Sequence, residues 1–250
     1  MPSRTPSHRP HEAAPPSVLI TAGPTHEPID AVRYLANRSS GRLGLSLAEA
    51  ARGQGCRTTL LLGPVGGLGD VLTNTQTGPA NADPEQAPDS GPAVHRFRSS
   101  TDLEALLTRE SPACDVLIMA AAVADYRPTS PVAGKLPRTG ETLTLALEPV
   151  PDLLAMATKT LKPGAIAIGF ALEEDAGSHE RAMAKMARKG CHAIVLNPLA
   201  TMDSPGIDAT ILFADGSPPL VPGPLSKDAF ARRLIEVSLG LWAHRQGSAS

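Results

Sequence analysis

The 250 residues favour one enzyme-sized domain, with enough chain to bury a large core. Hydrophobic residues make up 42% and charged residues 19%, and 23 basic against 25 acidic side chains give a formal net charge of −2. This composition is typical of a globular protein and excludes a generally disordered chain or a strongly basic nucleic-acid-binding protein. Aromatic residues are only 3%, which argues against a stacking surface for single strands.

The chain shows no sign of secretion or membrane insertion. Residues 1–16 are rich in Pro and lack an apolar run, so they are predicted to be a flexible tail rather than a signal peptide. The longest apolar stretch, Val116 to Ala124, is far shorter than the ~18 residues of a membrane span. The three cysteines, Cys56, Cys114 and Cys191, form no C-x-x-C pattern and fit reduced thiols. We therefore expect a cytoplasmic protein with neither membrane nor nucleic acid as a partner.

The first elements form a β-α-β unit. A β-branched run at 18–22 predicts a strand that ends at Gly23, and a second run at 58–62 ends at Gly63. Between them Leu43, Leu47 and Ala51 recur at helical spacing. The loop after the first strand is unusually long for such a unit.

The middle of the chain repeats this alternation after a long excursion. Residues 63–91 carry many Gly, Pro, Asn and Asp and little periodic apolarity, so we expect a loop there. A short strand at 94–98 is followed by a helix at 101–110, whose Thr101 and Glu104 have the spacing of a capping box. Residues 115–120 then predict a buried strand.

The remaining elements complete an α/β pattern. The alternation of Leu143, Leu145 and Leu147 predicts a strand in a flap over the sheet. Further predicted elements are a strand at 165–169, a helix at 178–189, a strand at 192–196, a hairpin at 214–216 and a last helix from Ser226. The sequence thus predicts a mostly parallel sheet with helices on both faces.

A small polar segment precedes the first helix and is suited to bind an anion. Asn37-Arg38-Ser39-Ser40-Gly41 lies where the free N–H groups and positive dipole end of a helix favour phosphate. The alternative is that Ser39 or Ser40 merely caps the helix. The residues alone leave both interpretations open.

A second candidate segment follows the strand at 115–120. Small residues before Asp125 leave room at the carboxyl edge of the sheet, where open α/β folds bind ligands, and Asp125 offers a carboxylate. Asp125 could equally serve as a local backbone acceptor. Lys135 lies in a Gly-flanked segment without helical or strand periodicity. The simpler interpretation is that Lys135 is a solvated surface lysine.

Lys185 and Lys189 are four residues apart on a predicted helix and share one face. Both could contact one polyphosphate, although a solvated basic stripe is the commoner reason for such spacing. The chain lacks the P-loop sequence, the G-x-S-x-G elbow and the H-E-x-x-H pair, and no G-x-G-x-x-G follows the first strand.

Five segments in this order resemble the bacterial phosphopantothenoylcysteine synthetase family. They are T-A-G-P-T-H-E-P-I-D-A-V-R-Y-L-A-N-R-S-S-G-R-L-G (21–44), A-A-A-V-A-D-Y-R-P (120–128), P-D-L-L (151–154), I-G-F-A-L-E (168–173) and the helix lysines. The resemblance covers 17–250 as one domain and implies a Rossmann-like fold with a flap at 126–148 over the active site. Because no decarboxylase domain precedes Ser17, we expect a stand-alone ligase without flavin.

The resemblance implies a two-step ligation in coenzyme A biosynthesis that uses CTP and Mg²⁺. The carboxylate of 4′-phosphopantothenate attacks the α-phosphate of CTP and expels pyrophosphate, and the amine of L-cysteine then displaces CMP from the acyl-cytidylate. The mixed anhydride supplies the leaving group that a carboxylate lacks, and cations neutralise charge on the phosphoryl oxygens. The family also implies a homodimer.

The family's functional residues carry over to matching positions. Asn37 matches the asparagine that holds the activated acyl group, and Lys135 matches the first lysine of the flap, so both are predicted to be catalytic. Ser39, Ser40 and Gly41 are interpreted as a phosphate site. The predicted nucleotide contacts are Met119, Ala120, Ala121, Asp125, Pro151, Asp152, Leu153, Leu154, Phe170, Lys185 and Lys189. The metal ligands are not identified.

The flap departs from the family pattern, since Lys135-Leu-Pro-Arg138 stands where K-x-K-K is common. Arg138 presents its charge with a different geometry and Pro137 stiffens the segment. Three alternatives stay open: an ATP-using version of the ligase, a nicotinamide-dependent oxidoreductase on a Rossmann-type sheet, and a nucleotide-binding module without turnover. The missing glycine fingerprint counts against the oxidoreductase.

Overall fold

The computed structural model describes residues 14–66, 91–173, 177–199, 204 and 206–248. The predicted tail, apart from 14–16, and the predicted excursion, apart from its two ends, lie outside these residues. The backbone N–H of Arg57 donates to the carbonyl of Pro16 (3.0 Å), so the first described residues already pair with the second strand of the predicted β-α-β unit.

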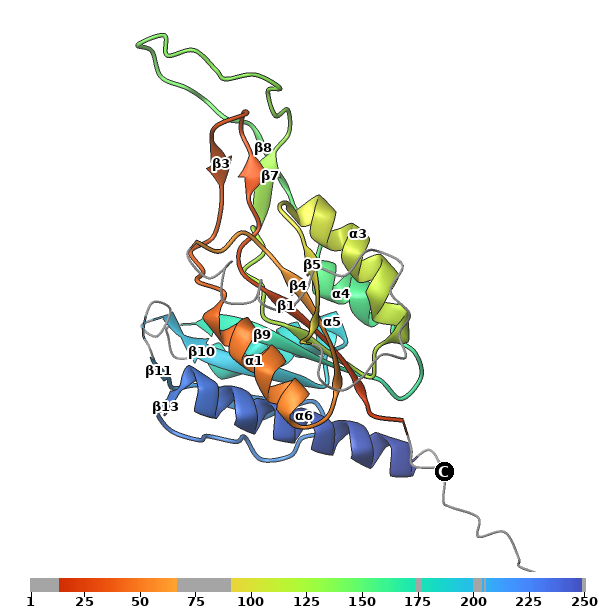
Figure 1. The fold of residues 1–250 in the computed structure, drawn as a ribbon. Helices are drawn as coiled ribbons and strands as arrows, with labels where there is room; N and C mark the ends of the chain where they lie inside the picture. The colour runs from red at the N-terminus through yellow and green to blue at the C-terminus, as the bar shows by residue number, and fades with distance from the viewer. Residues whose placement is uncertain (1–13, 67–90, 174–176, 200–203, 205, 249–250) are drawn as a thin grey trace, which may run out of the picture.

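A seven-stranded sheet forms the centre of the molecule (Figure 1). Its order is β12-β10-β9-β6-β1-β4-β5, and all neighbours are parallel except β12, which runs antiparallel to β10. The bounds are β1 (Ser17–Ala22), β4 (Arg57–Leu62), β5 (Ala93–Arg96), β6 (Val116–Met119), β9 (Ile166–Glu173), β10 (Ala193–Pro198) and β12 (Thr210–Phe213). The predicted α/β fold with a mostly parallel sheet is confirmed.

Helices cover both faces of this sheet. One face packs against α1 (Arg42–Gly53) and α6 (Lys227–Ser248), and the other against α3 (Ser100–Glu110), α4 (Leu153–Thr158) and α5 (Ser178–Lys189). Successive side chains of a strand point to opposite faces, so Val18 and Ile20 of β1 join the first core while Leu19 joins the second. Burial on both faces explains why β1 is a continuous apolar run rather than an alternating one.

The chain crosses from one side of β1 to the other between β5 and β6. Strands β4 and β5 extend the sheet on one side of β1, whereas β6, β9, β10 and β12 extend it on the other. In open α/β sheets the crevice at the carboxyl ends of the strands beside such a reversal is the usual ligand site. Here that crevice lies between β1 and β6.

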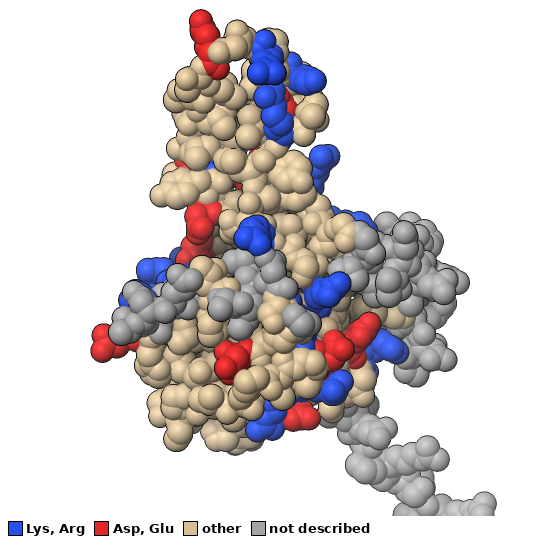
Figure 2. Space-filling model, turned by 90° about the vertical axis from the view of Figure 1, so that its left-hand side faces the viewer, with Lys and Arg blue, Asp and Glu red and all other residues tan. Residues whose placement is uncertain are grey.

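An arm projects beyond the sheet (Figure 1). It consists of residues 26–35 and 126–149, which contain the hairpin β2 (Glu27–Pro28) and β3 (Tyr34–Leu35) and the antiparallel pair β7 (Tyr126–Pro128) and β8 (Leu147–Pro149). The β2–β3 hairpin accounts for the long loop after the first strand. In Figure 2 basic side chains gather at the upper end of the molecule, where the arm projects.

Two local predictions are wrong. The strand expected over 143–147 is limited to Leu147–Pro149, because β7 ends at Pro128 and leaves Leu143 and Leu145 without a partner strand. The capping box of α3 is formed by Ser99 and Asp102 rather than Thr101 and Glu104. The helix begins at Ser100 since Ser99 is extended and its hydroxyl accepts from the Asp102 N–H (3.2 Å).

The remaining elements are short. A 3-10 turn, η1 (Ser111–Ala113), follows α3, and β11 (Gly206–Ile207) pairs with β13 (Leu225–Ser226) before α6. The predicted hairpin at 214–216 returns to β12 through one bridge between Ile211 and Leu220. Within the described residues no helix has the length and apolarity needed to cross a bilayer.

The three cysteines are buried and unpaired, and each lies near the sheet. Burial raises the pKa of the Cys114 thiol to about 12 and that of Cys191 to about 11. Thiols with such values remain protonated at neutral pH and are poor nucleophiles. They therefore act as small apolar side chains of the core.

Because of His192, we expect the protein to lose stability in mild acid. Its Nδ1 accepts a hydrogen bond from the backbone N–H of Ala167 (3.0 Å), and burial, with a smaller effect of Arg245, lowers its pKa below 6.5. The unfolded chain therefore binds this proton more readily, and the free energy of unfolding falls as the pH drops below about 6.5. Urea unfolding between pH ~5 and ~7.5 measures the slope.

The matched variant is His192→Asn, whose side-chain oxygen can accept from Ala167 but does not titrate. It should show a shallower pH dependence than the parent protein. A smaller slope should remain, because burial also lowers the pKa of His26. Identical slopes in the two proteins would contradict the assignment to His192.

Candidate functional site

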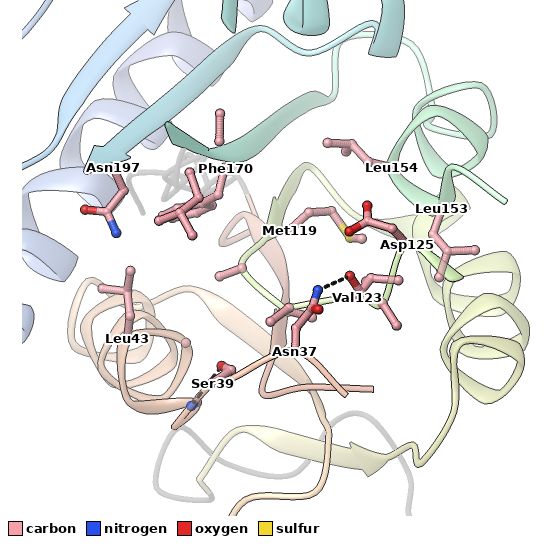
Figure 3. A pocket seen from close by; sticks show the side chains of 18 of the residues that line it. Asn37, Ser39, Leu43, Met119, Val123, Asp125, Leu153, Leu154, Phe170 and Asn197 are labelled. Carbon is pink, nitrogen blue, oxygen red and sulfur yellow. Dashed lines mark hydrogen bonds between the residues drawn. The ribbon is translucent and has the colours of Figure 1, made fainter. Parts of the chain in front are cut away.

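A cavity of about 900 Å³ opens at the carboxyl ends of β1, β6 and β9, at the crevice described above (Figure 3). It is lined by the segment before and at the start of α1, the loop after β6, the start of α4, and parts of β9, α5 and β10. The structure brings together there every predicted site residue except Lys135, namely Asn37, Ser39, Ser40, Gly41, Met119, Ala120, Ala121, Asp125, Pro151, Asp152, Leu153, Leu154, Phe170, Lys185 and Lys189.

The start of α1 is shaped by glycine. Gly41 is the N-cap in the left-handed conformation (φ 70°), and no side chain caps this helix. The interpretation of Ser39 or Ser40 as a helix cap is therefore wrong, although the Ser39 hydroxyl accepts from the Gly41 N–H (3.3 Å). The first intrahelical bond runs from the Leu45 N–H to the Gly41 carbonyl, so the N–H groups of Arg42, Leu43 and Gly44, which line the cavity, have no partner within the helix.

Gly44 lets this helix approach the sheet. A Cβ on Gly44 would lie 2.3 Å from the Cβ of Ala22, at the end of β1. Such a distance is too short for two carbon atoms, so only glycine fits without displacing the helix. The helix N-terminus therefore lies directly against the end of β1.

Two buried threonines fix the loop after β6. The hydroxyl of Thr21 accepts from the Ala121 N–H (3.0 Å), and that of Thr25 accepts from the Ala124 N–H (3.0 Å). Both threonines are fully buried. Asp125 follows directly, and its carbonyl accepts from the Val150 N–H (2.9 Å). The loop that carries Asp125 is thus rigidly joined to the loop after β1.

Asn37 is held by the same loop. Its side-chain Nδ2 donates to the carbonyl of Val123 (2.8 Å), as the dashed line in Figure 3 shows. Asn37 and Asp125 lie on the same side of the cavity in that view, whereas Phe170 and Asn197 lie across from them. The amide is therefore oriented at the cavity wall.

Lys189 forms an ion pair within the cavity wall. Its Nζ lies 3.1 Å from the Oδ1 of Asp152, which also caps α4 by accepting from the Ala155 N–H (3.1 Å). Both side chains are partly exposed, so solvent screens the pair and it contributes little to stability. Its effect is to orient the Lys189 ammonium at the wall between α4 and α5.

Lys135 lies outside the cavity. It is exposed in the arm, within the segment 132–136. The predicted flap therefore does not bring this lysine to the wall of the cavity of its own chain in this structure.

Several lining residues were not predicted. Arg38, Arg42 and Arg188 are sequence neighbours of predicted residues, and their position in the same loop or helix was the available signal. Asn197 near the end of β10 follows the rule that ligands bind at carboxyl ends of strands. Ile207 and Lys227 come from distant segments and had no local signal.

The charges around the cavity favour an anion. Among the residues that the structure describes, the carboxylates that line it are Asp125 and Asp152, and the latter is paired with Lys189. The cationic side chains that line it are Arg38, Arg42, Lys185, Arg188, Lys189 and Lys227. Cations gathered in a concave site focus the positive potential and concentrate anionic ligands. The cavity is suited to a polyphosphate or to two phosphorylated ligands.

Comparisons with known proteins show the family of this chain. Residues 14–240 match the family model of the DNA/pantothenate metabolism flavoprotein C-terminal domain. Over 220 residues the chain is 32% identical to the coenzyme A biosynthesis bifunctional protein CoaBC of Mycobacterium tuberculosis H37Rv, covering 83% of this chain and 48% of that protein. It is 32% identical over 228 residues to CoaBC of Vibrio cholerae, covering 88% and 51%.

One further relative carries another name. It is a cysteine/cysteine sulfinic acid decarboxylase from an unknown prokaryotic organism, 37% identical over 182 residues, which cover 73% of this chain and 45% of that protein. The chain thus spans about half the length of the curated relatives that it matches.

Solved structures share the fold. The C-terminal domain of CoaBC superposes with a TM-score of 0.69 at 28% identity, covering 90% of this chain and 95% of that domain. The complex of the Cab2 H337A mutant with phosphopantothenate-cysteine gives a TM-score of 0.67 at 18% identity, covering 92% of this chain and 89% of the other. The second likeness shows the fold alone.

Proposed function

Because the chain belongs to the family of the DNA/pantothenate metabolism flavoprotein C-terminal domain, we propose that it is the ligase that joins 4′-phosphopantothenate to L-cysteine in coenzyme A biosynthesis. The relatives named for coenzyme A biosynthesis, and the solved domain at 28% identity, support this activity. We further propose a cytoplasmic homodimer, whose oligomeric state sedimentation would establish.

The proposed reaction has two steps. The substrate carboxylate attacks the α-phosphate of CTP, forming an acyl-cytidylate and releasing pyrophosphate. The cysteine amine then attacks the acyl carbon, loses a proton and displaces CMP, which leaves the amide. Both steps occur at one site, so the cavity must hold a triphosphate and a second phosphorylated molecule together.

The observation that carries the proposal is the excess of cations around one cavity at the carboxyl ends of the strands. Among the described lining residues, the carboxylates are Asp125 and Asp152, whereas the cations are Arg38, Arg42, Lys185, Arg188, Lys189 and Lys227. Cations fixed before the reaction stabilise the negative charge that develops on the transferring phosphoryl oxygens. The volume of about 900 Å³ lies near the upper end for small-molecule sites, which suits two ligands rather than one.

Asn37 and Asp125 are the polar side chains proposed to orient the reactants. Asn37 lies where its amide can hold the acyl oxygen while Val123 keeps its orientation. Asp125 offers a carboxylate to a nucleotide hydroxyl or amino group from a loop that Thr25 holds in place. The start of α1, with Gly41 and Gly44, presents backbone N–H groups to a phosphate.

The residues fit a Mg²⁺ ion that arrives with the triphosphate. In the described part of the chain no group of three or more His, Cys, Asp or Glu side chains is placed to hold a metal. Mg²⁺ is commonly held by one or two carboxylates together with substrate phosphates, and among the described lining residues Asp125 is the carboxylate not paired with Lys189. Such an ion would neutralise phosphate charge and orient the triphosphate.

A pyrophosphate assay tests the proposal. Release should require both 4′-phosphopantothenate and a nucleoside triphosphate, and phosphopantothenoylcysteine should appear only when cysteine is added. Parallel reactions with CTP and ATP establish the base preference. No release with either nucleotide would reject the ligase, and binding without release would support the nucleotide-binding module.

Lys135→Gln should slow pyrophosphate release while CTP binding changes little. Lys135 does not line the cavity, so its charge should act mainly as negative charge develops during phosphoryl transfer. The rate at saturating CTP and the dissociation constant of CTP are measured separately. Arg138→Gln, on the same exposed segment, is the matched control. An equal loss of rate and affinity would make Lys135 a simple binding residue.

A further inference from the structure

Asp30 lies in the tip of the β2–β3 hairpin and is the most heavily hydrogen-bonded carboxylate of the arm. Its side chain is fully buried although the arm projects from the sheet. Its Oδ1 accepts from the N–H groups of Val32 (2.8 Å) and Arg33 (2.7 Å), and its Oδ2 accepts from both Nε (2.9 Å) and Nη2 of Arg33.

The same carboxylate reaches the flap. Asp30 Oδ2 also accepts from the backbone N–H of Leu136 (3.0 Å), and Arg33 Nη2 donates to the carbonyl of Leu136 (2.8 Å). Both backbone groups of Leu136 are thus held by one ion pair. More than 100 residues separate the two sides of this contact.

Backbone pairs on either side extend the junction. The N–H of Val132 donates to the carbonyl of Ile29 (3.0 Å), and the N–H of Ala31 donates to the carbonyl of Gly134 (3.3 Å). Lys135 therefore lies between two residues, Gly134 and Leu136, that are both hydrogen-bonded to the hairpin. We call these contacts, made by 29–33 with 132–136, the latch.

The energetics of the latch make the hairpin and the flap segment one body. The hydrogen bonds from Arg33, with those from Val32 and Leu136, hold the pKa of Asp30 well below its usual range, so the carboxylate stays ionised at neutral pH. The Asp30 side chain is fully buried, so loss of Arg33 would leave its charge uncompensated, which is unfavourable. The flap segment should therefore move with the hairpin rather than separate from it.

The latch connects the two proposed catalytic residues. The hairpin strand β3 ends at Leu35, two residues before Asn37 at the cavity wall. Leu136, held by Asp30, is the next residue after Lys135. Any change in the latch therefore alters where Lys135 lies relative to Asn37.

Resting on the proposed function, we infer that Asp30 is a positioning residue that fixes the Lys135 segment to the hairpin and so determines where the Lys135 ammonium acts during pyrophosphate release. Asp30 itself has no contact with the cavity, since it does not line it. Its effect on the reaction passes through Leu136 and the backbone of Lys135.

The first test uses Asp30→Asn and does not depend on the reaction. The substitution keeps the shape of the side chain but removes the charge that binds Arg33 and Leu136. Trypsin cleavage between Lys135 and Leu136, followed by mass spectrometry of the intact chain, should become about tenfold faster because the segment opens locally. An unchanged cleavage rate would overturn the inference.

Glu27→Gln is the matched control. Glu27 is a buried carboxylate of the same hairpin, but it accepts from the N–H (2.9 Å) and hydroxyl (3.0 Å) of Ser100 in α3 instead of from the flap. Glu27→Gln should leave the rate of trypsin cleavage after Lys135 unchanged. Faster cleavage in both variants would assign the effect to general loosening of the hairpin and overturn the latch.

The second test is a double-mutant cycle on pyrophosphate release. Asp30→Asn should lower the rate at saturating CTP about 10- to 100-fold, as expected when a reacting group is misplaced, and leave the dissociation constant of CTP unchanged. In the Lys135→Gln background it should have no further effect, whereas Glu27→Gln should act equally in both backgrounds. Asp30→Glu should restore part of the rate.

Two outcomes would overturn the positioning role: a normal rate in Asp30→Asn, or a further loss when it is added to Lys135→Gln. If the parent chain releases no pyrophosphate, the proposed function fails instead, and the cleavage experiment still decides whether the latch exists.

Discussion

Asn37→Asp is expected to form the acyl-cytidylate and then to consume it about 100-fold more slowly than the parent protein, as when one preorganised hydrogen-bond donor is lost. The Asn37 Nδ2 donates to the Val123 carbonyl (2.8 Å). A carboxylate cannot donate there, and its charge would repel both that carbonyl and the phosphate of the intermediate. Pyrophosphate should appear in a burst close to one equivalent per site, while amide formation lags.

The measurement is rapid quenching followed by chromatographic separation of CTP, the acyl-cytidylate and CMP. Asn197→Asp is the charge-matched control, because Asn197 lines the same cavity on the opposite side from Asn37 (Figure 3). It adds the same negative charge without removing the contact to Val123. Accumulation of the intermediate in both variants would assign the effect to cavity charge, and normal turnover of Asn37→Asp would remove Asn37 from the reaction.

Gly44→Ala is expected to lower the free energy of unfolding more than a methyl group added at any other position of α1. The new Cβ would lie 2.3 Å from the Cβ and 3.0 Å from the Cα of Ala22, which is itself fully buried. Neither atom belongs to a flexible side chain, so the helix must move away from the strand. Overpacking of this kind lowers the free energy of unfolding by about 1–3 kcal/mol.

Gly53→Ala, in the same helix, is the control. A Cβ there meets nothing within 4 Å, and alanine favours helix over glycine, so its free energy of unfolding should stay the same or rise by up to ~1 kcal/mol. Urea unfolding of the three proteins gives the comparison. Since Gly44 also lines the cavity, Gly44→Ala should weaken CTP binding as the helix N-terminus shifts. Equal stability of the two variants would contradict the close approach of α1 to β1.

Hydrophobic periodicity predicted the elements of the main sheet and its helices, and elements that lack such a period were missed. The strand at 18–22 and the helix at 178–189 were found because burial on both faces, or along one helical face, imposes a period on the sequence. The hairpin β2–β3 has no such period, since it packs against the flap and exposes Val32 and Tyr34. The prediction placed the N-cap of α3 at Thr101 instead of Ser99, because both residue types suit an N-cap.

The site divides in a similar way. The segment around Asn37 and the loop at Asp125 were predicted because each directly follows a strand or precedes a helix, where ligands bind by local geometry. Thr21 and Thr25 were missed, although they hold that loop, because a threonine in an apolar run has no signal beyond its strand preference. Ile207 and Lys227 were missed because only the folded chain brings them to the cavity.

The sequence by itself determined the alternation of strands and helices and the family resemblance, because each depends on residues near one another in the chain. Only the tertiary structure decided that Lys135 lies outside the cavity, that Asp152 pairs with Lys189, and that Asp30 binds the backbone of Leu136. These contacts join residues far apart in sequence. A hydrogen bond or ion pair depends on the distance between two atoms, and that distance is set only when the whole chain has packed.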